Sequence, residues 1–315
     1  MFLRNFHRHF SVFLFFLLTL YTTRALFPLS NFNEAGLLVY RPVRLSAVAK
    51  TLYETRIAPD PLFARIAVVA IRWLRAEDIE PGEYKIASSG SLLSRISSLS
   101  KQKPKKLHVM FPTGFTNSQI VSRLTNALAL TGHITRIPME GMLFPYTYFY
   151  VPGDSRQSVI DEMQRRREKE LKKLSKYKKF DVKQILTLAS MIEKETGRKE
   201  ERHIVASVYF NRLKKNIRLQ SCPTVIYSVV YGQKRTFSEI SKVRLFNISA
   251  YNTYRLKGLP PTPICNPSIE SIKAALYPAE TDFLFFVADK PDSSSKHNFS
   301  KDFCSHVRNK KQLNK

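Results

Sequence analysis

The sequence of 315 residues has little of what metal-binding, disulfide-rich and nucleotide-binding proteins need. It has three cysteines, Cys222, Cys265 and Cys304, so at most one pair could form a disulfide bond, and their spacing does not say which. A cysteine nucleophile would need a positioned histidine, for which there is no motif. No His or Cys spacing typical of a metal site and no glycine-rich phosphate loop occurs. We therefore expect neither a metal ion nor a cofactor.

Acidic residues are also scarce: 25 Asp and Glu stand against 51 Lys and Arg, and the formal net charge is +26. Such an excess predicts an anionic partner, such as nucleic acid, phospholipid headgroups or an acidic polymer, without choosing among them. Many basic residues lie in a predicted charged helix over residues 155–180. Acidic residues are interspersed there and no nucleic-acid-binding signature accompanies them, so we expect a solvated face and no nucleic acid partner.

Long hydrophobic runs are absent except near the N-terminus. A basic flank precedes a charge-free run of 14 residues that begins at Phe10, FSVFLFFLLTLYTT. At 1.5 Å per residue this run reaches about 21 Å, short of a hydrocarbon core of about 30 Å, so a span needs the residues up to Leu29 with Arg24 at the interface. The layout is typical of a signal anchor, or of a signal peptide cleaved after Ala25, and the basic flank places the N-terminus inside.

The stretch that carries the chemistry is an apolar helical pattern that ends in two acidic residues. The apolar positions recur at helical spacing, which predicts a helix over residues 182–196. At 100° per residue, Glu195 lies within about 60° of Leu188 and Met191, whereas Glu193 falls on a less apolar side. Because burial and the negative end of the helix dipole both raise a carboxyl pKa, Glu195 suits a general acid near neutral pH.

From spacing alone a second interpretation of Glu195 stays open. A glutamate before a helix end is commonly a solvated or salt-bridged residue, here with Lys199 or Arg202 as the partner. A second helix is predicted over residues 201–215, a short helix over 269–276 and a buried strand over 283–288.

Four segments resemble, in order and spacing, the endolytic murein transglycosylases of the MltG (YceG-like) family: IEKETGRKEERHIVASVYFNRL, RLQSCPTVIY, AYNTYRLKGLPPTPICNPSIESIKAALYPAE, and FLFFVAD followed by HNFS. The resemblance covers roughly residues 80–308 and is dense from 185 onward. In that family the second Glu of the EKET motif is the catalytic acid, and it falls on Glu195. The resemblance therefore implies that Glu195 is catalytic and that Glu193 supports it.

The resemblance also implies the residues around the acid. Gln220 and Ser221 are expected to face substrate hydroxyl and amide groups. Asn252 and Tyr254 are expected to line the groove, with a structural turn as the alternative. The supporting and stacking candidates are Asn211 and Arg212, which would brace the cleft, and Tyr148, whose ring could stack on a sugar.

Three positions depart from the family pattern. Cys222 and Tyr146 each stand where an Asp is usual, and Thr113 stands where an acidic residue often precedes the glycine. A neutral thiol does not accept hydrogen bonds as a carboxylate does, so either the Asp replaced by Cys222 is structural or the site is altered.

The predicted fold is α+β. It comprises an N-terminal membrane anchor, a small LysM-like α/β module that serves as a spacer or a glycan binder, and a mixed α/β catalytic domain with a helix-borne glutamate. The module is predicted from a strand over 81–86, a helix over 91–99, a strand over 107–112 and a helix over 116–130, with a candidate first strand over 37–45. The predicted divisions are a cytoplasmic N-terminus (1–9), a transmembrane signal anchor (10–29), a membrane-proximal region with the LysM-like module (30–135), an aromatic segment and charged helix (136–180), the catalytic transglycosylase domain (181–309) and a basic tail (310–315).

The activity that the resemblance implies is endolytic cleavage of the bond between N-acetylmuramic acid and N-acetylglucosamine in nascent peptidoglycan strands. It leaves 1,6-anhydro ends and terminates elongation. The implied setting is a single pass through the bacterial inner membrane, which favours the uncleaved anchor, with the catalytic domain on the periplasmic side and penicillin-binding protein synthases as partners. A membrane-anchored murein-binding scaffold with a degenerate site is the alternative, and a basic nucleic-acid-binding protein is a third class.

Overall fold

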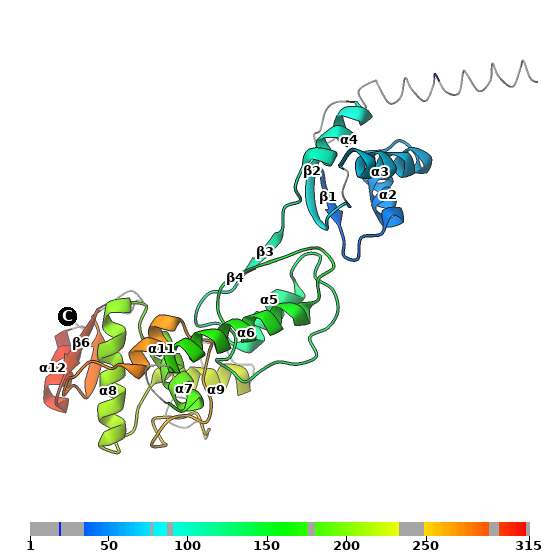
Figure 1. The fold of residues 1–315 in the computed structure, drawn as a ribbon. Helices are drawn as coiled ribbons and strands as arrows, with labels where there is room; N and C mark the ends of the chain where they lie inside the picture. Colours follow the sequence, from blue (N-terminus) through cyan, green and yellow to red (C-terminus); the bar gives the residue numbers. More distant parts are fainter. Residues whose placement is uncertain are drawn as a thin grey trace, which may run out of the picture. The chain divides into compact units, whose positions relative to one another are not determined.

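The computed structural model describes Thr19 and residues 35–75, 78–86, 91–175, 180–232, 249–289 and 296–312 (Figure 1). The predicted anchor over residues 10–29 lies outside these ranges except for Thr19. Within them, no helix combines the length and the apolar character needed to cross a bilayer. The chain divides into two compact units: the first comprises Met1–His108, Ala127–Thr131 and Phe149–Ser155, and the second comprises Val109–Asn126, Gly132–Tyr148 and Arg156–Lys315.

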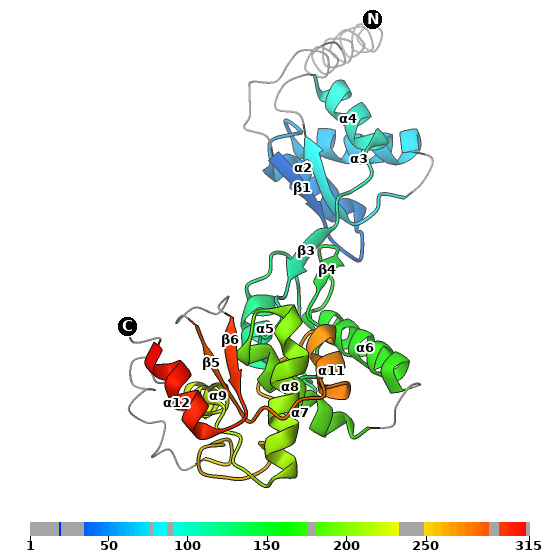
Figure 2. The same cartoon turned by 90° about the vertical axis from the view of Figure 1, so that its left-hand side faces the viewer.

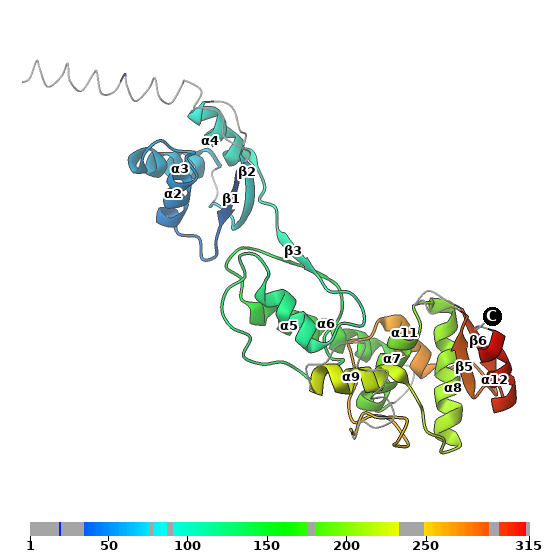
Figure 3. The ribbon, with the colours of Figure 1, turned by 180° about the vertical axis from the view of Figure 1, so that it is seen from behind.

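The first unit is a small module built on one antiparallel strand pair. Strand β1 (Ala35–Val39) pairs with β2 (Gly82–Ile86). Helices α2 (Leu45–Glu54) and α3 (Pro61–Arg75) form between these strands and lie together on one side of the pair (Figures 1 and 3). Helix α4 (Leu92–Lys101) follows β2. Apolar side chains from all five elements make one core, which includes Leu37, Val39, Val48, Leu52, Ala64, Val68, Ile71, Tyr84, Ile86 and Leu99.

The composition of this module differs from the prediction. Strand β3 (Leu107–Met110) pairs with β4 (Thr147–Tyr150) and not with β2, and helix α5 (Asn117–Thr125) belongs to the second unit. The physical reason is that β1 supplies the apolar strand face that α2 and α3 need, so the module closes without the later strand and helix.

The second unit is mainly helical. Its long charged helix α6 (Arg156–Ser175) precedes α7 (Val182–Glu195), a short 3-10 turn η1 (Lys199–Glu201) and α8 (Arg202–Lys214). Helices α9 (Cys222–Gly232) and α11 (Ile269–Leu276) follow. An antiparallel pair, β5 (Phe285–Ala288) and β6 (His297–Ser300), lies beside the last helix α12 (Phe303–Gln312) (Figure 2).

Helix α7 is the central element of this unit, because α8, α9 and α11 all pack against it. Its residues from Leu186 to Ile192 are all buried, so it carries no solvent face over two turns. The predicted helices over 182–196, 201–215 and 269–276 agree with α7, α8 and α11 to within one residue. Strand β5 is shorter than predicted and half-buried rather than buried.

Candidate active site

The end of helix α7 places Glu195 at a boundary between the core and solvent. At the other end, the Asp181 side chain accepts a hydrogen bond from the backbone N–H of Gln184 and so fixes where the helix begins. Thr196 already has an extended backbone, and its N–H closes the last turn on the carbonyl of Ile192. Glu195 is therefore the last helical residue, at the negative end of the helix dipole, and it is largely buried.

The two oxygens of Glu195 have different surroundings. Oε1 accepts hydrogen bonds from the hydroxyl of Tyr209, at 2.7 Å, and from Oγ of Ser221, at 2.6 Å. Within the described part of the chain, no hydrogen bond reaches Oε2. The protein thus fixes the orientation of the carboxyl through one oxygen and leaves the other for a proton or a substrate atom.

Burial raises the pKa of Glu195 above its ordinary value. The hydrogen bonds from Ser221 and Tyr209, and the positive charges of His297 and Arg212, act in the opposite direction without cancelling the effect of burial. Burial, together with the charge of Glu195, raises the pKa of Tyr209 well above its ordinary value, so Tyr209 stays protonated and donates. A carboxyl in this setting keeps its proton closer to neutral pH, as a general acid requires.

Ser221 reaches the carboxyl because of an unusual backbone conformation just before it. Gln220 has a φ of 51°, in the left-handed region that non-glycine residues seldom adopt. Hydrogen bonds hold this turn: the N–H of Gln220 donates to the carbonyl of Thr253, and the N–H of Ser221 donates to Oγ1 of Thr253. Helix α9 begins at the next residue.

Arg212 and Asn211 each make more than one hydrogen bond beside this region. Arg212 donates from Nε to the carbonyl of Leu284 and from Nη1 to Oε1 of Gln220 and to the carbonyl oxygens of Arg218 and Leu219. Asn211 donates from Nδ2 to the carbonyl oxygens of Thr281 and Phe283. The two side chains therefore fasten α8 to the segment that carries Ser221 and to the segment that leads into β5.

Glu193 has a different environment from Glu195. Its Oε2 accepts hydrogen bonds from the N–H of Ser268, from Oγ of Ser268 and from Oγ of Ser271, and Nη2 of Arg202 lies 3.4 Å from Oε1. Burial alone would raise the pKa of Glu193, but these hydrogen bonds and the Arg202 charge outweigh it and lower the pKa. Glu193 is thus an ionised anchor between α7 and the start of α11, and Arg202 pairs with it rather than with Glu195.

The HNFS segment is also tied to the end of α7. Nδ1 of His297 lies 2.7 Å from Oε2 of Glu201, and the His297 backbone N–H donates to Oε1 of the same carboxylate. Oγ1 of Thr196, the residue after Glu195, donates to Glu201 at 3.4 Å. Strand β6 is therefore connected through one carboxylate to the residue next to the acid.

Three expected substrate contacts have other surroundings. The side chain of Asn252 is fully buried, and its Oδ1 accepts the N–H of Tyr254, which is the turn geometry of the structural alternative. Tyr254 is half-buried and packs against Val225 of α9. Tyr148 is buried, its hydroxyl donates to the carbonyl of Phe144, and its ring has no exposed face to offer a sugar, so the stacking prediction is wrong.

The departures from the family pattern lie in different places. Cys222 is the first residue of α9 and is half-buried, and none of the three cysteines, all of which lie in the described ranges, forms a disulfide bond. Tyr146 is exposed, and the guanidinium of Arg166 lies 4.9 Å from the centre of its ring. Thr113 is exposed.

Two groups with perturbed pKa values, Tyr209 and the carboxyl of Glu140, were not among the residues that the sequence pattern predicted. Tyr209 could have been found from its place on the core-facing line of α8, four residues after Val205. Glu140 accepts hydrogen bonds from the N–H of Asn117 and from Nδ2 of Asn266, and burial raises its pKa to about 7. No pattern in the sequence distinguishes it from a solvated glutamate.

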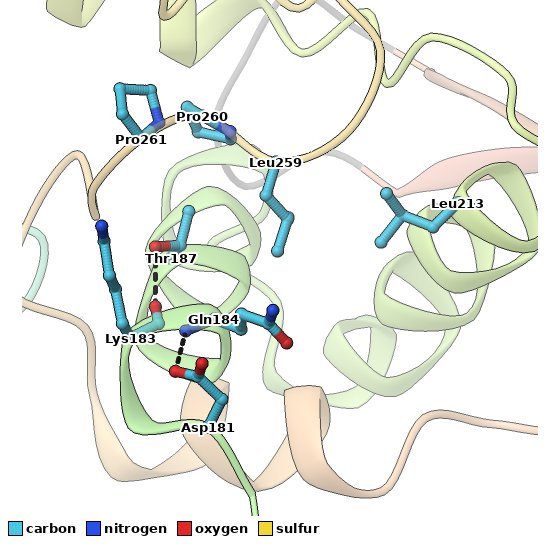
Figure 4. A pocket seen from close by; sticks show the side chains of 8 residues that line it. All are labelled: Asp181, Lys183, Gln184, Thr187, Leu213, Leu259, Pro260 and Pro261. Carbon is cyan, nitrogen blue, oxygen red and sulfur yellow. Dashed lines mark hydrogen bonds between the residues drawn. The ribbon is translucent and has the colours of Figure 1, made fainter.

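A cavity of about 640 Å³ lies at the other end of α7 (Figure 4). Its lining joins the first turns of α7 to the end of α8 and to the proline-rich loop, and comprises Asp181, Lys183, Gln184, Thr187, Leu213, Leu259, Pro260 and Pro261. Gln184 precedes Glu195 by eleven residues, about 16 Å along the helix axis, so this cavity does not contain the acid. Across the described ranges, no three His, Cys, Asp or Glu side chains gather in a way that could hold a metal ion.

Comparisons with known proteins identify relatives. The model of the YceG-like family matches residues 39–312. The endolytic murein transglycosylase of Bacillus subtilis (strain 168) is 41% identical over 155 residues, which are 48% of this chain and 42% of the relative. The protein of the same name from Streptococcus pneumoniae serotype 2 (strain D39 / NCTC 7466) is 31% identical over 205 residues, 61% of this chain and 37% of the relative. The matched part thus spans about two fifths of each curated relative.

A solved structure gives the same assignment. The crystal structure of a YceG-like protein from Listeria monocytogenes is 25% identical and has a TM-score of 0.51. The match covers 87% of this chain and 98% of the Listeria chain.

Proposed function

Because the chain belongs to the YceG-like family, we propose that it is an endolytic murein transglycosylase with Glu195 as its catalytic acid. The observation that carries the proposal is the asymmetric setting of this carboxyl. Two donors fix one oxygen, the pKa is raised, and the second oxygen has no hydrogen bond within the described residues. The curated relatives that bear this name support the substrate class.

In the proposed reaction, Oε2 of Glu195 donates its proton to the glycosidic oxygen between N-acetylmuramic acid and N-acetylglucosamine. The bond from the muramyl C1 to that oxygen breaks through an oxocarbenium-like transition state, and the N-acetylglucosamine leaves with the proton. The ionised carboxylate then accepts the proton of the muramyl C6 hydroxyl as its oxygen attacks C1. The product carries a 1,6-anhydro end, the carboxyl is protonated again, and no water is consumed.

The surroundings of the neighbouring carboxylate, Glu193, suit a reaction that uses one acid. Hydrolysing glycosidases place a second carboxylate opposite the first, either as base or as nucleophile. Glu193 is rotated by about 200° from Glu195 around the helix and is already bound by Ser268, Ser271 and Arg202, so it does not serve as that group. Ser221 and Tyr209 orient the acid, and Gln220 is the exposed residue beside them that we assign to substrate binding.

The setting of the enzyme is part of the proposal. We place it at the bacterial inner membrane with the second unit outside the cytoplasm, anchored by residues 10–29, where it acts on nascent strands beside penicillin-binding protein synthases. The first unit, with two helices between its paired strands, corresponds to the proposed LysM-like module. The basic FHRH flank before the apolar run supports this orientation.

The test uses the full chain in detergent micelles with uncrosslinked glycan strands, followed by mass spectrometry of the new ends. We expect 1,6-anhydro-muramyl ends from the native protein and none from Glu195→Gln, which keeps the size of the side chain and an acceptor for Tyr209 and Ser221. Reducing ends in place of anhydro ends would show a hydrolase and would refute the proposed reaction.

The second candidate function is a murein-binding scaffold with a degenerate site, which the thiol of Cys222 in place of the usual Asp favours. It predicts that the native chain binds glycan strands in a sedimentation assay and cuts nothing. A Cys222→Asp variant separates the two cases: cleavage that appears only in the variant would identify this position as the defect.

A further inference from the structure

Helix α3 of the first unit has two apolar faces, of which only one is covered. Its inner face, which includes Ala64, Val68 and Ile71, packs into the core of the module. The opposite side carries large apolar side chains that are more than half exposed: Leu62 at 54%, Ile66 at 53%, Val69 at 64% and Trp73 at 80%.

These four exposed residues form one continuous stripe. Their spacing of four, three and four residues places them within a sector of about 60° at 100° per residue. Ile71, which is buried, lies about 170° from the centre of that sector. The solvent face of a surface helix ordinarily carries polar residues, and a continuous exposed apolar surface marks a site of interaction.

The residues beside the stripe indicate what it contacts. Arg65 and Arg72 are exposed and lie together on one flank, where Nε of Arg72 is 3.1 Å from Oδ1 of Asp78. Leucine, isoleucine and tryptophan on one side of a helix with arginine beside them is the arrangement of helices that lie in a membrane interface. Trp73 is also the residue type that concentrates at the level of the headgroups.

The chain before this module supplies a second observation. The apolar segment that begins at Phe10 is predicted to span the membrane as far as Leu29, with Arg24 at the interface, and β1 begins at Ala35. The five intervening residues extend at most about 20 Å, so an inserted run holds the first unit beside the bilayer surface. A tether of this length keeps any apolar face of the unit at a high effective concentration near lipid.

We propose that the exposed stripe of α3 lies in the interface of an anionic bilayer, with Leu62, Ile66, Val69 and Trp73 at the boundary of headgroups and acyl chains and Arg65 at the lipid phosphates. The proposal rests on the predicted anchor and does not depend on the proposed catalytic activity. It makes the module a second membrane contact that orients the first unit on the surface.

The sequence provides its own probe, because Trp73 is the only tryptophan. The full chain is reconstituted into nanodiscs of phosphatidylcholine and phosphatidylglycerol, formed with a scaffold protein that lacks tryptophan and with either ordinary or brominated acyl chains. Bromines quench tryptophan only on contact within the bilayer, and iodide quenches it from water. We expect brominated lipid to reduce the emission of Trp73. We also expect iodide to quench Trp73 less in nanodiscs than in the chain unfolded by urea without detergent.

Two variants, each at a residue that is equally exposed in the native chain, test whether the stripe is responsible for the quenching of Trp73. Val69→Glu introduces a charge into the stripe and should restore iodide quenching and abolish quenching by brominated lipid. Leu128→Glu is the matched control, because Leu128 is also 64% exposed and lies in the same unit outside α3. It should leave both quenching values unchanged.

Two results would overturn the proposal. If iodide quenches Trp73 fully and brominated lipid does not, the stripe is exposed to water. Trp73 that neither reagent quenches would show that protein covers the stripe, either a second copy or another segment of this chain. The measurement on the native chain decides between these outcomes even when a variant fails to fold.

Discussion

Removal of the Ser221 hydroxyl should raise the pKa of Glu195. The hydroxyl lies 2.6 Å from Oε1 and stabilises the ionised carboxylate more than the neutral acid. A hydrogen bond to a charged group contributes about 1.5–3 kcal/mol, and about 1.4 kcal/mol corresponds to one pKa unit. Ser221→Ala should therefore raise the pKa of Glu195, and the ionised carboxylate loses at most about 3 kcal/mol of stabilisation.

A raised pKa of Glu195 should change the pH dependence of the cleavage rate in a definite direction. Glu195 must be protonated to act as the acid, so kcat/KM falls as pH rises through its pKa. With the pKa raised, the descending limb of the profile should move to higher pH in Ser221→Ala, even though the maximum rate falls because the carboxyl is less well oriented. The assay is the initial rate of 1,6-anhydro end formation between pH 5 and 9.

Ser271→Ala is the matched control. Ser271 donates to Glu193 at 2.7 Å, so this variant removes the same kind of hydrogen bond from the neighbouring carboxylate. Its profile should keep the descending limb of the native protein. If the limb moves in Ser271→Ala and stays fixed in Ser221→Ala, the roles given to the two glutamates are reversed; if it moves in neither, the titrating acid is another group.

Three further changes test the supporting groups. Glu193→Gln should lower the free energy of unfolding by about 3 kcal/mol at neutral pH, because Arg202 is left without its carboxylate. Urea unfolding measures this loss, which should shrink as pH falls through the lowered pKa of Glu193. Burial of Glu140 should by itself lower the free energy of unfolding of the native chain by at most about 3 kcal/mol between pH 4.5 and about 7, because Glu140 ionises first in the unfolded state. Glu140→Gln should remove this part of the pH dependence in the same assay. Arg212→Lys should lower both melting temperature and cleavage rate, since lysine cannot reproduce the fork that holds Gln220; an unchanged rate would refute the bracing role.

The helix that carries the proposed acid could be predicted because it depends on local pattern. Helical spacing of apolar residues defines α7, and the angle between Glu193 and Glu195 follows from the helix period. The family resemblance then selected Glu195, and the structure adds the raised pKa and the distinct oxygens.

The partners of the acid could not be predicted in the same way. Tyr209 and Ser221 follow Glu195 by 14 and 26 residues on other elements, and their convergence depends on how α8 and α9 pack. Tyr148 and Asn252 show the opposite problem. A tyrosine or asparagine in an aromatic or turn-rich segment suits a sugar contact and a buried hydrogen bond equally well in sequence, and only the packing decides.

Local sequence pattern also could not predict which elements belong to the small module. The strand over 107–112 and the helix over 116–130 have the right periodicity for an α/β module. However, β1 pairs with one edge of β2, and the chain meets the other edge at the bridge between Glu83 and Lys105 before β3 pairs with β4. Strand pairing is a choice among competing partners along the whole chain, so periodicity predicts that a strand exists without naming its neighbour.

Glu195 lies at a position where a carboxyl lowers the stability of the folded protein. An amino acid chosen for stability alone at the end of α7 would be apolar or amide-bearing, because ionisation of the buried carboxyl at neutral pH acts against folding. The proposed activity would therefore depend on a surplus of stability in the rest of the second unit. Mutations that erode this surplus without contacting Glu195, for example loss of the hydrogen bond from Ser268 to Glu193, should be tolerated less well in the native chain than in a Glu195→Gln background.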